Sequence, residues 1–314
     1  MSDLFASELS DLIETDVRRN VRMSDHTSFR IGGTADLFFE ATSQEQIILA
    51  VNWAHVLDVP WIVIGSGTNI LVSDEGIRGL IIKNACAKVH VEESRVVTEA
   101  GALTSHVVHE TLSRGLAGME FLAGLPGTIG GAVAGNAGCF GRAVGALLEW
   151  AVVLEAGKMP IRRYPSWFEF DYRSSILQAT QGVLLEASFV IAPGDTEELL
   201  ETERKNIEFR HLRHPMNACS AGSYFKNLDP PAADQPRVPA GLLLDQAGCM
   251  GMKVGDAVVF EKHSNIIVNQ GKAKARDILE LAEKMKQKVR EKFDTELEPE
   301  VRFLGNPPSI KKAP

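Results

Sequence analysis

The chain has 314 residues, of which 45% are hydrophobic and 24% are charged, and this is the composition of a globular protein with two or three domains. Its 33 basic and 41 acidic residues give a net charge of -8, which argues against broad binding to nucleic acid or to an anionic membrane. The first residues lack a basic region followed by an apolar one, and the four cysteines form no C-x-x-C pair, so we expect a cytoplasmic protein with reduced thiols.

The first block, 15–83, alternates strand and helix patterns. The run ADLFFEAT predicts a strand, and Ser43–Leu57 predicts an amphipathic helix that a capping box over Thr42–Glu45 would begin. The run WIVIG predicts the next strand. Further strands, with a turn at Glu92–Ser94, are predicted within LIIKNACAKVHVEESRVVTEAGA.

The strand WIVIG leads into the loop Gly65–Asn69. Glycine lets the backbone approach an anion closely, so this loop could hold phosphate with its N–H groups. It matches neither standard signature, because Ile70 stands where G-x-G-x-x-G needs glycine and no lysine completes G-x-x-x-x-G-K-[ST]. This mismatch excludes a Rossmann or P-loop fold, and a simple turn is the ordinary alternative.

The second block, 84–202, contains a helix predicted at Thr104–Arg114, which Gly115 ends, and strands in EWAVVLEAG and GVLLEASFVIAPG. Between them, Phe121–Gly141 carries no charge and has the length of a transmembrane helix. Seven glycines and Pro126 in these 21 positions argue against that helix, since each interior glycine costs roughly 1 kcal/mol relative to alanine. We expect instead a backbone packed closely against a ligand.

The third block, 203–305, follows a charged helical run and contains a proline-rich turn at Asp229–Pro239. Its long helix is predicted over Ala273–Phe293, with an apolar stripe that we interpret as core. The stripe consists of Ile278, Leu281, Met285 and Val289. A final strand is predicted in LEPEVRFLG. These elements predict an α+β or mixed α/β nucleotide-binding module with a separate cap domain.

A second glycine-rich loop, GLPGTIGGAVAGNAG, changes the interpretation of the first. A pyrophosphate carries charge at two centres, and two backbone-lined loops could hold it without a lysine. Together the two loops predict a dinucleotide site, although neither identifies the dinucleotide.

Three short segments could carry catalytic side chains. In FDYRSS, Arg173 could hold a carboxylate or phosphate through its planar fork, and an exposed ion pair is the alternative. In CSAGSYFKN, Ser223 lacks a nucleophile elbow and could equally be a turn or capping serine. In LEPEVR, Glu298 and Glu300 would share one face of a strand, but Pro299 disturbs that geometry and the segment could be an ordinary surface strand. Two histidine pairs spaced i, i+3 lack a ligand set of the zinc type, so no metal is predicted.

These segments occur in the order found in the UDP-N-acetylenolpyruvoylglucosamine reductase family, the MurB flavoenzymes of peptidoglycan precursor synthesis, which the sequence closely resembles. The resemblance extends from HTSFRIGGTADLFFE to LEPEVRFLG and includes GSGTNILVSDEGIRGLII, GLPGTIGGAVAGNAG, YRSS, SAGSYFKN, AGLLLDQAGCMGMKVGDA and EKHSNIIVN. Several long motifs in family order are more specific than either loop alone. The chain lacks the extra tyrosine-bearing substrate loop of part of the family and so resembles its shorter type.

The resemblance implies an α+β fold, with a two-lobed FAD-binding module of the vanillyl-alcohol-oxidase (PCMH-like) type at 15–83 and 84–202 and a smaller α+β substrate-binding domain at 203–305. It implies bound FAD, with NADPH as the hydride donor. NADPH reduces the flavin, flavin N5 gives hydride to the enolpyruvyl methylene carbon of UDP-N-acetylglucosamine enolpyruvate, and protonation of the adjacent carbon gives UDP-N-acetylmuramate. No oligomeric state follows from the resemblance, and we expect a monomer.

The resemblance also implies roles for three catalytic residues. Arg173 is the cation beside the enolate-like charge, Ser223 donates the proton to the α-carbon, and Glu300 completes the site. A bare carboxylate would repel the developing charge, so we predict that desolvation and nearby negative charge raise the pKa of Glu300.

Other positions are implied to bind the ligands. Tyr172 and Asn227 match substrate-contacting positions, and we expect Lys226 to assist the substrate electrostatically. The positions expected at FAD are Gly65, Ser66, Gly67, Thr68, Asn69, Gly127, Thr128, Gly130, Gly131, Asn136, Gly138 and Arg302.

Two other functions share part of these features. A flavin-dependent oxidase that acts on an alcohol with oxygen could use the same FAD module, and a nucleotide-sugar-binding protein could retain it without catalysis. Arg173, Ser223 and Glu300 together favour the reductase, since its reaction needs an enolate to be stabilised and protonated. Tyr224 and Cys139 differ from the residues usual in the family, but neither removes a catalytic position.

Overall fold

The structure, a computed structural model, describes residues 3–214, 218–232 and 234–306. The chain divides into two units. Unit 1 comprises residues 1–20, 36–66 and 79–210, and unit 2 comprises residues 21–35, 67–78 and 211–314. Each unit therefore combines segments that are far apart in the sequence. This division differs from the domain boundaries predicted at 15–83, 84–202 and 203–305, which stay a prediction.

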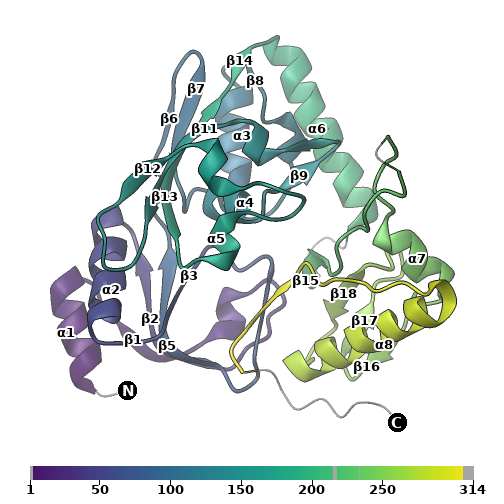
Figure 1. Ribbon diagram of the computed structural model, residues 1–314, viewed down its shortest axis with the longest axis horizontal. Helices are drawn as coiled ribbons and strands as arrows, with labels where there is room; N and C mark the ends of the chain where they lie inside the picture. The colour runs from purple at the N-terminus through teal and green to yellow at the C-terminus, as the bar shows by residue number, and fades with distance from the viewer. Residues whose placement is uncertain (1–2, 215–217, 233, 307–314) are drawn as a thin grey trace. The chain divides into compact units, whose positions relative to one another are not determined.

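The first lobe of unit 1 is a sheet with two helices on one face (Figure 1). Its elements are α1 (Asp3–Ile13), β1 (Arg18–Arg22), β2 (Thr34–Ala41), α2 (Gln44–Val56), β3 (Trp61–Ile64) and β5 (Ile77–Asn84). The strand order is β1-β2-β5-β3, and β3 runs parallel to β5. Successive side chains of a strand point to opposite faces, so Leu37 and Phe39 enter the core beneath α1 and α2 while Phe38 lies on the other face. The predicted strands in ADLFFEAT and WIVIG are confirmed.

Helix α2 begins with a capping box one residue later than predicted. The Ser43 side chain accepts a hydrogen bond from the Gln46 N–H at 3.3 Å, and Gln46 Oε1 accepts one from the Ser43 N–H at 3.4 Å. The box predicted over Thr42–Glu45 is wrong, because the overlapping Ser43–Gln46 pair also fits the pattern and satisfies both backbone N–H groups.

The second lobe of unit 1 is built on an antiparallel sheet of order β12-β11-β13-β7-β6. The sheet strands are β6 (Val89–Val91), β7 (Arg95–Glu99), β11 (Leu148–Leu154), β12 (Ile161–Arg163) and β13 (Val183–Val190). The predicted turn between β6 and β7 is confirmed, since the Glu92 N–H donates to the carbonyl of Arg95 at 2.9 Å. The strands predicted in EWAVVLEAG and GVLLEASFVIAPG are confirmed as β11 and β13.

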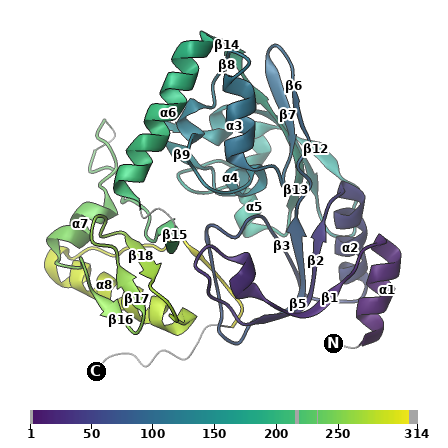
Figure 2. The same ribbon diagram turned by 180° about the vertical axis from the view of Figure 1, so that it is seen from behind.

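Helices and short strands cover this second sheet, and Figure 2 shows helix α3 on its face. These elements are α3 (Thr104–Leu112), β8 (Leu116–Ala117), α4 (Ile129–Ala134), β9 (Gly138–Cys139), β10 (Arg142–Ala143), α5 (Ile176–Ala179), β14 (Ala192–Pro193) and α6 (Thr196–Arg213). Short 3-10 helices of this lobe lie at Glu120–Leu122, Val144–Ala146 and Pro165–Phe168, and another, in unit 2, lies at Met23–His26. Helix α3 ends two residues before the predicted Arg114, and Gly115 follows with a φ of +70°.

The glycine-rich stretch forms only the six-residue helix α4. No helix in the described part of the chain is long and apolar enough to cross a bilayer. At Gly130 the backbone packs against the protein itself, since an added Cβ would lie 3.0 Å from the carbonyl oxygen of Ala100. The close packing against a ligand expected of this stretch stays a prediction.

Unit 2 is a second α+β unit. Its elements are β4 (Ile70–Val72), β15 (Cys219–Ser223), α7 (Ala240–Gln246), β16 (Lys253–Val254), β17 (Ala257–Val259), β18 (Ile266–Asn269), α8 (Ala275–Phe293) and β19 (Arg302–Leu304). The main sheet has the order β15-β18-β17-β16, and β19 pairs in parallel with β4. The apolar stripe predicted for α8 is confirmed as core, since all four of its side chains are fully buried. The last strand is shorter than LEPEVRFLG, so Glu298 and Glu300 precede it.

Candidate functional site

The loop Gly65–Asn69 crosses from unit 1 to unit 2 after Ser66. In unit 1, Gly65 lies against the second glycine-rich loop, because a Cβ on Gly65 would come within 2.3 Å of Thr128 Oγ1. In unit 2, Gly67 has a φ of +70°, and its carbonyl accepts a hydrogen bond from the Ser28 N–H at 3.0 Å. The two glycine-rich loops therefore meet at Gly65 and Thr128, and glycine is required at this contact.

Ser66 carries a polar atom that fits a bound ligand. Its Oγ is buried and has no hydrogen-bond partner among the described residues. A buried hydroxyl left unpaired is costly, so such atoms usually pair with water or ligand when neither protein backbone nor side chain serves. Together with the tight contact at Gly65, this hydroxyl fits the polar phosphate region of a nucleotide such as FAD.

The second loop uses several of its N–H groups within the protein. The Gly130 N–H donates to the Ala100 carbonyl at 2.8 Å, and the Gly131 N–H donates to Thr128 Oγ1 at 3.4 Å. The N–H groups of Gly130 and Gly131 are therefore engaged within the protein and do not fit the expectation that this loop binds pyrophosphate through its N–H groups. Glycine at position 130 serves close packing instead, since an added Cβ would make a tight contact of 3.0 Å with the Ala100 carbonyl oxygen.

The YRSS segment forms a tight turn in unit 1. Asp171 and Ser174 exchange backbone hydrogen bonds at 3.1 and 3.2 Å, which makes Tyr172 and Arg173 the central pair of the turn. Arg173 has a φ of +54°, a region that costs a non-glycine residue about 1–3 kcal/mol. Its Nη1 donates to the carbonyl of Gly138 at 2.9 Å. The turn therefore sets the backbone of Arg173, and the bond to Gly138 orients its guanidinium.

Asn136 links this turn to the glycine-rich loop. Its Nδ2 donates to the carbonyl of Asp171 at 2.9 Å, and its Oδ1 accepts from the Gly145 N–H at 3.0 Å. The side chain of Asn136, placed at FAD from sequence, thus also supports the Arg173 turn. Sequence reasoning did not identify this link, because nothing local pairs position 136 with position 171.

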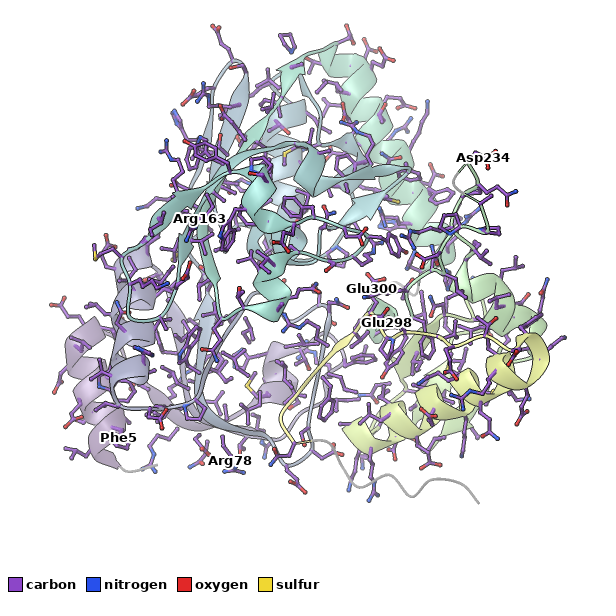
Figure 3. All side chains as sticks on the ribbon, in the orientation of Figure 1. Phe5, Arg78, Arg163, Asp234, Glu298 and Glu300 are labelled. Carbon is purple, nitrogen blue, oxygen red and sulfur yellow. The ribbon has the colours of Figure 1, made fainter. Side chains whose placement is uncertain are left out.

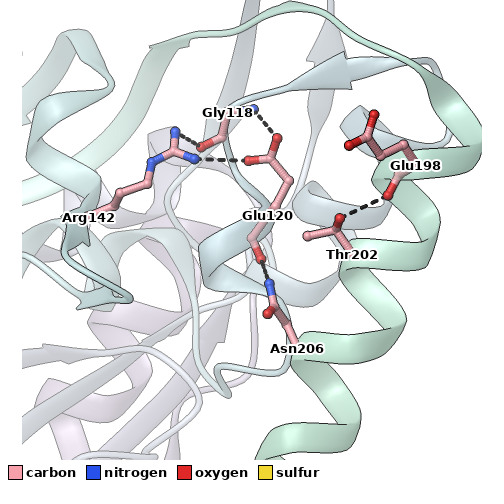
Figure 4. A network of polar contacts seen from close by, with 6 residues as sticks. All are labelled: Gly118, Glu120, Arg142, Glu198, Thr202 and Asn206. Carbon is pink, nitrogen blue, oxygen red and sulfur yellow. Dashed lines mark hydrogen bonds and ion pairs between the residues drawn. The ribbon is translucent and has the colours of Figure 1, made fainter.

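Gly138 lies on the β9–β10 hairpin, which a polar network anchors (Figure 4). Arg142 donates to the carbonyl of Gly118 at 2.7 Å and to Glu120 Oε2 at 3.2 Å, and Asn206 of α6 donates to the Glu120 carbonyl at 2.9 Å. The other oxygen of Glu120 accepts from the Gly118 N–H at 3.0 Å. The carbonyl that holds Arg173 is therefore part of a braced hairpin.

In unit 2, the structure brings Ser223 and Glu300 into neighbouring segments. The Glu300 N–H donates to the carbonyl of Tyr224 at 2.7 Å, and a bridge pairs Phe225 with Pro299. Ser223 ends strand β15, opposite Ile266. The Tyr224 ring packs in the core of unit 2, and burial raises the pKa of Tyr224 to about 12.

Lys226 lies on the same segment and pairs with Glu298. Its N–H donates to the Glu298 carbonyl at 2.8 Å, and its Nζ lies 2.7 Å from Glu298 Oε1. Glu298 is 71% exposed, so the ion pair is weak and Lys226 can exchange it for an anionic group. Figure 3 labels Glu298 and Glu300 on the segment that leads from α8 to β19. Asn227 Oδ1 accepts from the Ala240 N–H, the first residue of α7, at 3.2 Å.

Asn69, in the first glycine-rich loop, is hydrogen-bonded to the backbone of both Glu300 and Arg302. Asn69 Nδ2 donates to the carbonyl of Glu300 at 3.2 Å, although the two residues are 231 positions apart, and the Arg302 N–H donates to the Asn69 carbonyl at 3.1 Å. Predicted FAD-contacting and catalytic positions are thus adjacent in unit 2. The side chain of Asn69 is engaged with the backbone here.

The predicted site residues therefore form two groups. Unit 1 carries Arg173 with Tyr172, Gly65, Ser66 and the second loop, and unit 2 carries Ser223, Lys226, Asn227 and Glu300 with Gly67, Thr68, Asn69 and Arg302. Their roles, and the raised pKa predicted for Glu300, stay predictions. In the described ranges no group of three or more His, Cys, Asp or Glu side chains could hold a metal ion.

Two family models match the chain. The C-terminal domain of UDP-N-acetylenolpyruvoylglucosamine reductase matches residues 214–304, and an FAD binding domain matches residues 35–160. The first range contains Ser223 and Glu300, and the second contains both glycine-rich loops. Tyr172 and Arg173 lie outside both ranges.

Similar proteins extend over nearly the whole chain. The UDP-N-acetylenolpyruvoylglucosamine reductase of Rubrobacter xylanophilus is 42% identical over 287 residues, which are 90% of this chain and 93% of the relative. That of Clostridium novyi is 36% identical over 297 residues, 94% of each chain. Among solved structures, the UDP-N-acetylenolpyruvylglucosamine reductase (MurB) of Thermus caldophilus is 30% identical, with a TM-score of 0.77 over 92% of this chain and 100% of its own.

Proposed function

Because the chain belongs to the UDP-N-acetylenolpyruvoylglucosamine reductase family, we propose that it catalyses the NADPH-driven reduction of UDP-N-acetylglucosamine enolpyruvate to UDP-N-acetylmuramate. The chain is an FAD-dependent oxidoreductase, and its fold is the predicted one, α+β with an FAD-binding module of the vanillyl-alcohol-oxidase type and a smaller domain. The reduction it performs serves peptidoglycan precursor synthesis.

The observation that supports this proposal best is the pairing of the segment that carries Ser223 with the segment that carries Glu300. The Glu300 N–H donates to the carbonyl of Tyr224, the residue that follows Ser223. A reductase that forms and protonates an enolate needs a proton donor, whereas an oxidase that takes hydride from an alcohol needs a base for the hydroxyl proton.

In unit 1, Gly65, Ser66 and Thr128 would hold the flavin nucleotide. The family resemblance implies flavin contacts for Arg302 and the second half of the first loop as well. When bound, FAD supplies the hydride transfer from NADPH to the enolpyruvyl group. The unpaired Ser66 hydroxyl is a donor suited to a phosphate oxygen.

Arg173 stabilises the negative charge that develops on the substrate carboxylate. Its guanidinium is fixed at one end by Gly138, so the group is already oriented when the charge forms. A preorganised donor of this kind is worth roughly 3–4 kcal/mol of barrier. Tyr172, the other central residue of the turn, contacts the substrate.

Ser223 donates the proton to the α-carbon. Serine is a weak acid, so the hydroxyl must be held close to the carbon and reprotonated through a relay. Glu300, protonated, serves that relay and adds a donor to the enolate-like charge. Lys226 exchanges its weak pairing with Glu298 for negative charge on the substrate, and Asn227 orients the sugar nucleotide.

Anaerobic spectroscopy of the flavin tests the proposed function. NADPH is expected to bleach the bound FAD, and the UDP-enolpyruvyl sugar is expected to restore its absorbance with formation of UDP-N-acetylmuramate. A protein that binds no FAD, or a reduced flavin that oxygen reoxidises but the sugar does not, would contradict the proposal.

Substitution of Ser223 tests the protonation step. Ser223→Ala is expected to leave flavin reduction by NADPH unchanged and to slow reoxidation by the sugar by about 10²–10⁴-fold, the usual contribution of a general acid. Ser220→Ala is the matched control, because Ser220 lies on the same strand and pairs with Val268. Equal slowing of both half-reactions in Ser223→Ala would exclude its role as proton donor.

A further inference from the structure

Asn265 is a buried polar residue immediately before strand β18. It is 2% exposed, and a buried carboxamide is tolerated only when its donors and acceptor find partners. Its Oδ1 accepts from the Phe225 N–H at 2.9 Å, and its Nδ2 donates to the Phe225 carbonyl at 2.8 Å. Both ends of the side chain are thus engaged by the backbone of a single residue.

This side chain continues the ladder between β15 and β18 beyond the end of the strands. Ser223 lies opposite Ile266, and the Tyr224 N–H donates to the backbone carbonyl of Asn265 at 2.7 Å. At the next residue, Phe225, the carboxamide takes over, since it offers the same donor and acceptor as a peptide group. The segment that follows Ser223 is therefore held at Phe225 by two hydrogen bonds to the Asn265 side chain.

The opposite edge of the same segment carries the other site residues. The Tyr224 carbonyl accepts from the Glu300 N–H at 2.7 Å, and the Lys226 N–H donates to the Glu298 carbonyl at 2.8 Å. Residues 223–226 therefore lie between Asn265 on one side and the Glu298–Glu300 segment on the other. Any shift of this backbone moves Ser223, Lys226 and Glu300 together.

We propose that Asn265 is a positioning residue for protonation of the substrate. It acts through the backbone of Tyr224 and Phe225 and fixes Ser223 relative to Glu300. This inference rests on the function proposed above, because it assigns Asn265 to the step in which Ser223 donates its proton.

Three variants of the full-length FAD-loaded protein test the proposal. Asn265→Ala removes both side-chain bonds, and Asn265→Asp keeps an acceptor for the Phe225 N–H but loses the donor to its carbonyl. Asn269→Ala is the matched control at the other end of β18. Asn269 is 7% exposed, donates to the Phe29 carbonyl at 3.0 Å and accepts from the N–H groups of Gly271 and Ala273.

The first readout separates the two half-reactions. Flavin reduction by NADPH is expected to stay within about twofold of the wild type in every variant. Reoxidation by the UDP-enolpyruvyl sugar is expected to slow at least about tenfold in Asn265→Ala, less in Asn265→Asp and little in Asn269→Ala, since a misplacement of about 1 Å can cost 10²-fold. Equal slowing in Asn265→Ala and Asn269→Ala would overturn the proposal.

The second readout is independent of activity. Hydrogen–deuterium exchange of a peptide that contains Phe225 and Lys226 is expected to accelerate in Asn265→Ala and to stay unchanged in Asn269→Ala. Unchanged exchange in Asn265→Ala would overturn the proposal. Failure of the proposed function would be visible separately, because the sugar would then not reoxidise the reduced flavin of the wild type. The exchange experiment would still decide whether Asn265 holds the segment that contains Phe225.

Discussion

Gly65 and Arg173 show how single residues in this protein are fixed by backbone geometry. Gly65 has no space for a side chain beside Thr128, and Arg173 occupies a left-handed conformation that glycine usually takes. The glycine could be anticipated from sequence as part of a close-approach loop. The conformation of Arg173 could not, because arginine has no preference for it and the turn exists only through Asp171 and Ser174.

Gly65→Ala tests the contact between the two glycine-rich loops. An added Cβ would lie 2.3 Å from Thr128 Oγ1, so the loop must shift at a cost of roughly 1–3 kcal/mol. We expect a lower melting temperature of the apoprotein and weaker retention of FAD, measured by differential scanning fluorimetry and by flavin released on gel filtration.

Gly131→Ala serves as the control for that substitution. Its Cβ would lie 3.6 Å from the same oxygen, an ordinary contact, and alanine favours a helix over glycine by about 1 kcal/mol. The apoprotein should be as stable as the wild type or more so. Equal stability and equal FAD retention of Gly65→Ala and wild type would refute the tight contact.

At the scale of elements, sequence patterns identified helices α2, α3, α6 and α8 and the buried strands, but missed helix α1 (Asp3–Ile13) and the ends of several elements. The buried stripe of α8 was predicted correctly, because its apolar residues recur at helical spacing and therefore lie on one face of the helix. The start of the last described strand is a case of failure. LEPEVRFLG reads as one strand, yet only Arg302–Leu304 forms a strand, which pairs with the distant β4, while Glu298–Glu300 bonds to residues 224–226 outside any strand.

Met285→Ala tests the core of unit 2. Met285 is fully buried in α8, so truncation should lower the free energy of unfolding by roughly 2–5 kcal/mol. Lys284→Ala is the neighbouring control, since the Lys284 side chain is 51% exposed and its pairing with Glu280 is worth little. Urea unfolding monitored by circular dichroism would measure both, and equal values for the two variants would contradict the burial of the stripe.

At the scale of the whole molecule, the order of the motifs carried the prediction of function further than any physical pattern did. It predicted that Ser223 and Glu300 belong to one site, and in the structure Glu300 is hydrogen-bonded to Tyr224, the residue that follows Ser223. Patterning alone could not group residues 21–35 and 67–78 with unit 2, because hydrophobic periodicity reports local structure and not which distant segments pair. Asn265 left only a faint signal, an amide at the start of an apolar strand run.

Glu186 predicts how overall stability depends on pH. Burial, together with Glu99 directly opposite on β7, raises the pKa of Glu186 above its ordinary value of 4.5, while Arg162 opposes the shift. Because the pKa of Glu186 is higher in the folded state, its carboxyl contributes to the stability of the fold below pH 4.5. This contribution is lost as pH rises through the folded pKa. Glu186→Gln is therefore expected to raise the melting temperature at pH 7 and not at pH 4.

The control for this pH dependence is Glu155→Gln. Hydrogen bonds from Lys158 and Arg163 lower the pKa of Glu155, so its contribution has the opposite sign and is present above pH 4.5. Glu155→Gln should therefore not raise the melting temperature at pH 7. A melting temperature of Glu186→Gln that matches the wild type at both pH values would refute the burial effect.

The parallel pairing of β4 with β19 has a consequence for synthesis of the protein on the ribosome. Ile70–Val72 is made long before its partner Arg302–Leu304. The early segments of unit 2 must therefore wait for this strand before they can pair, since long-range pairing forms only when both partners are present. Glu300 directly precedes β19 and is made together with it. A nascent chain that stops before Glu300 therefore has neither a complete unit 2 nor the proposed pair of Ser223 and Glu300.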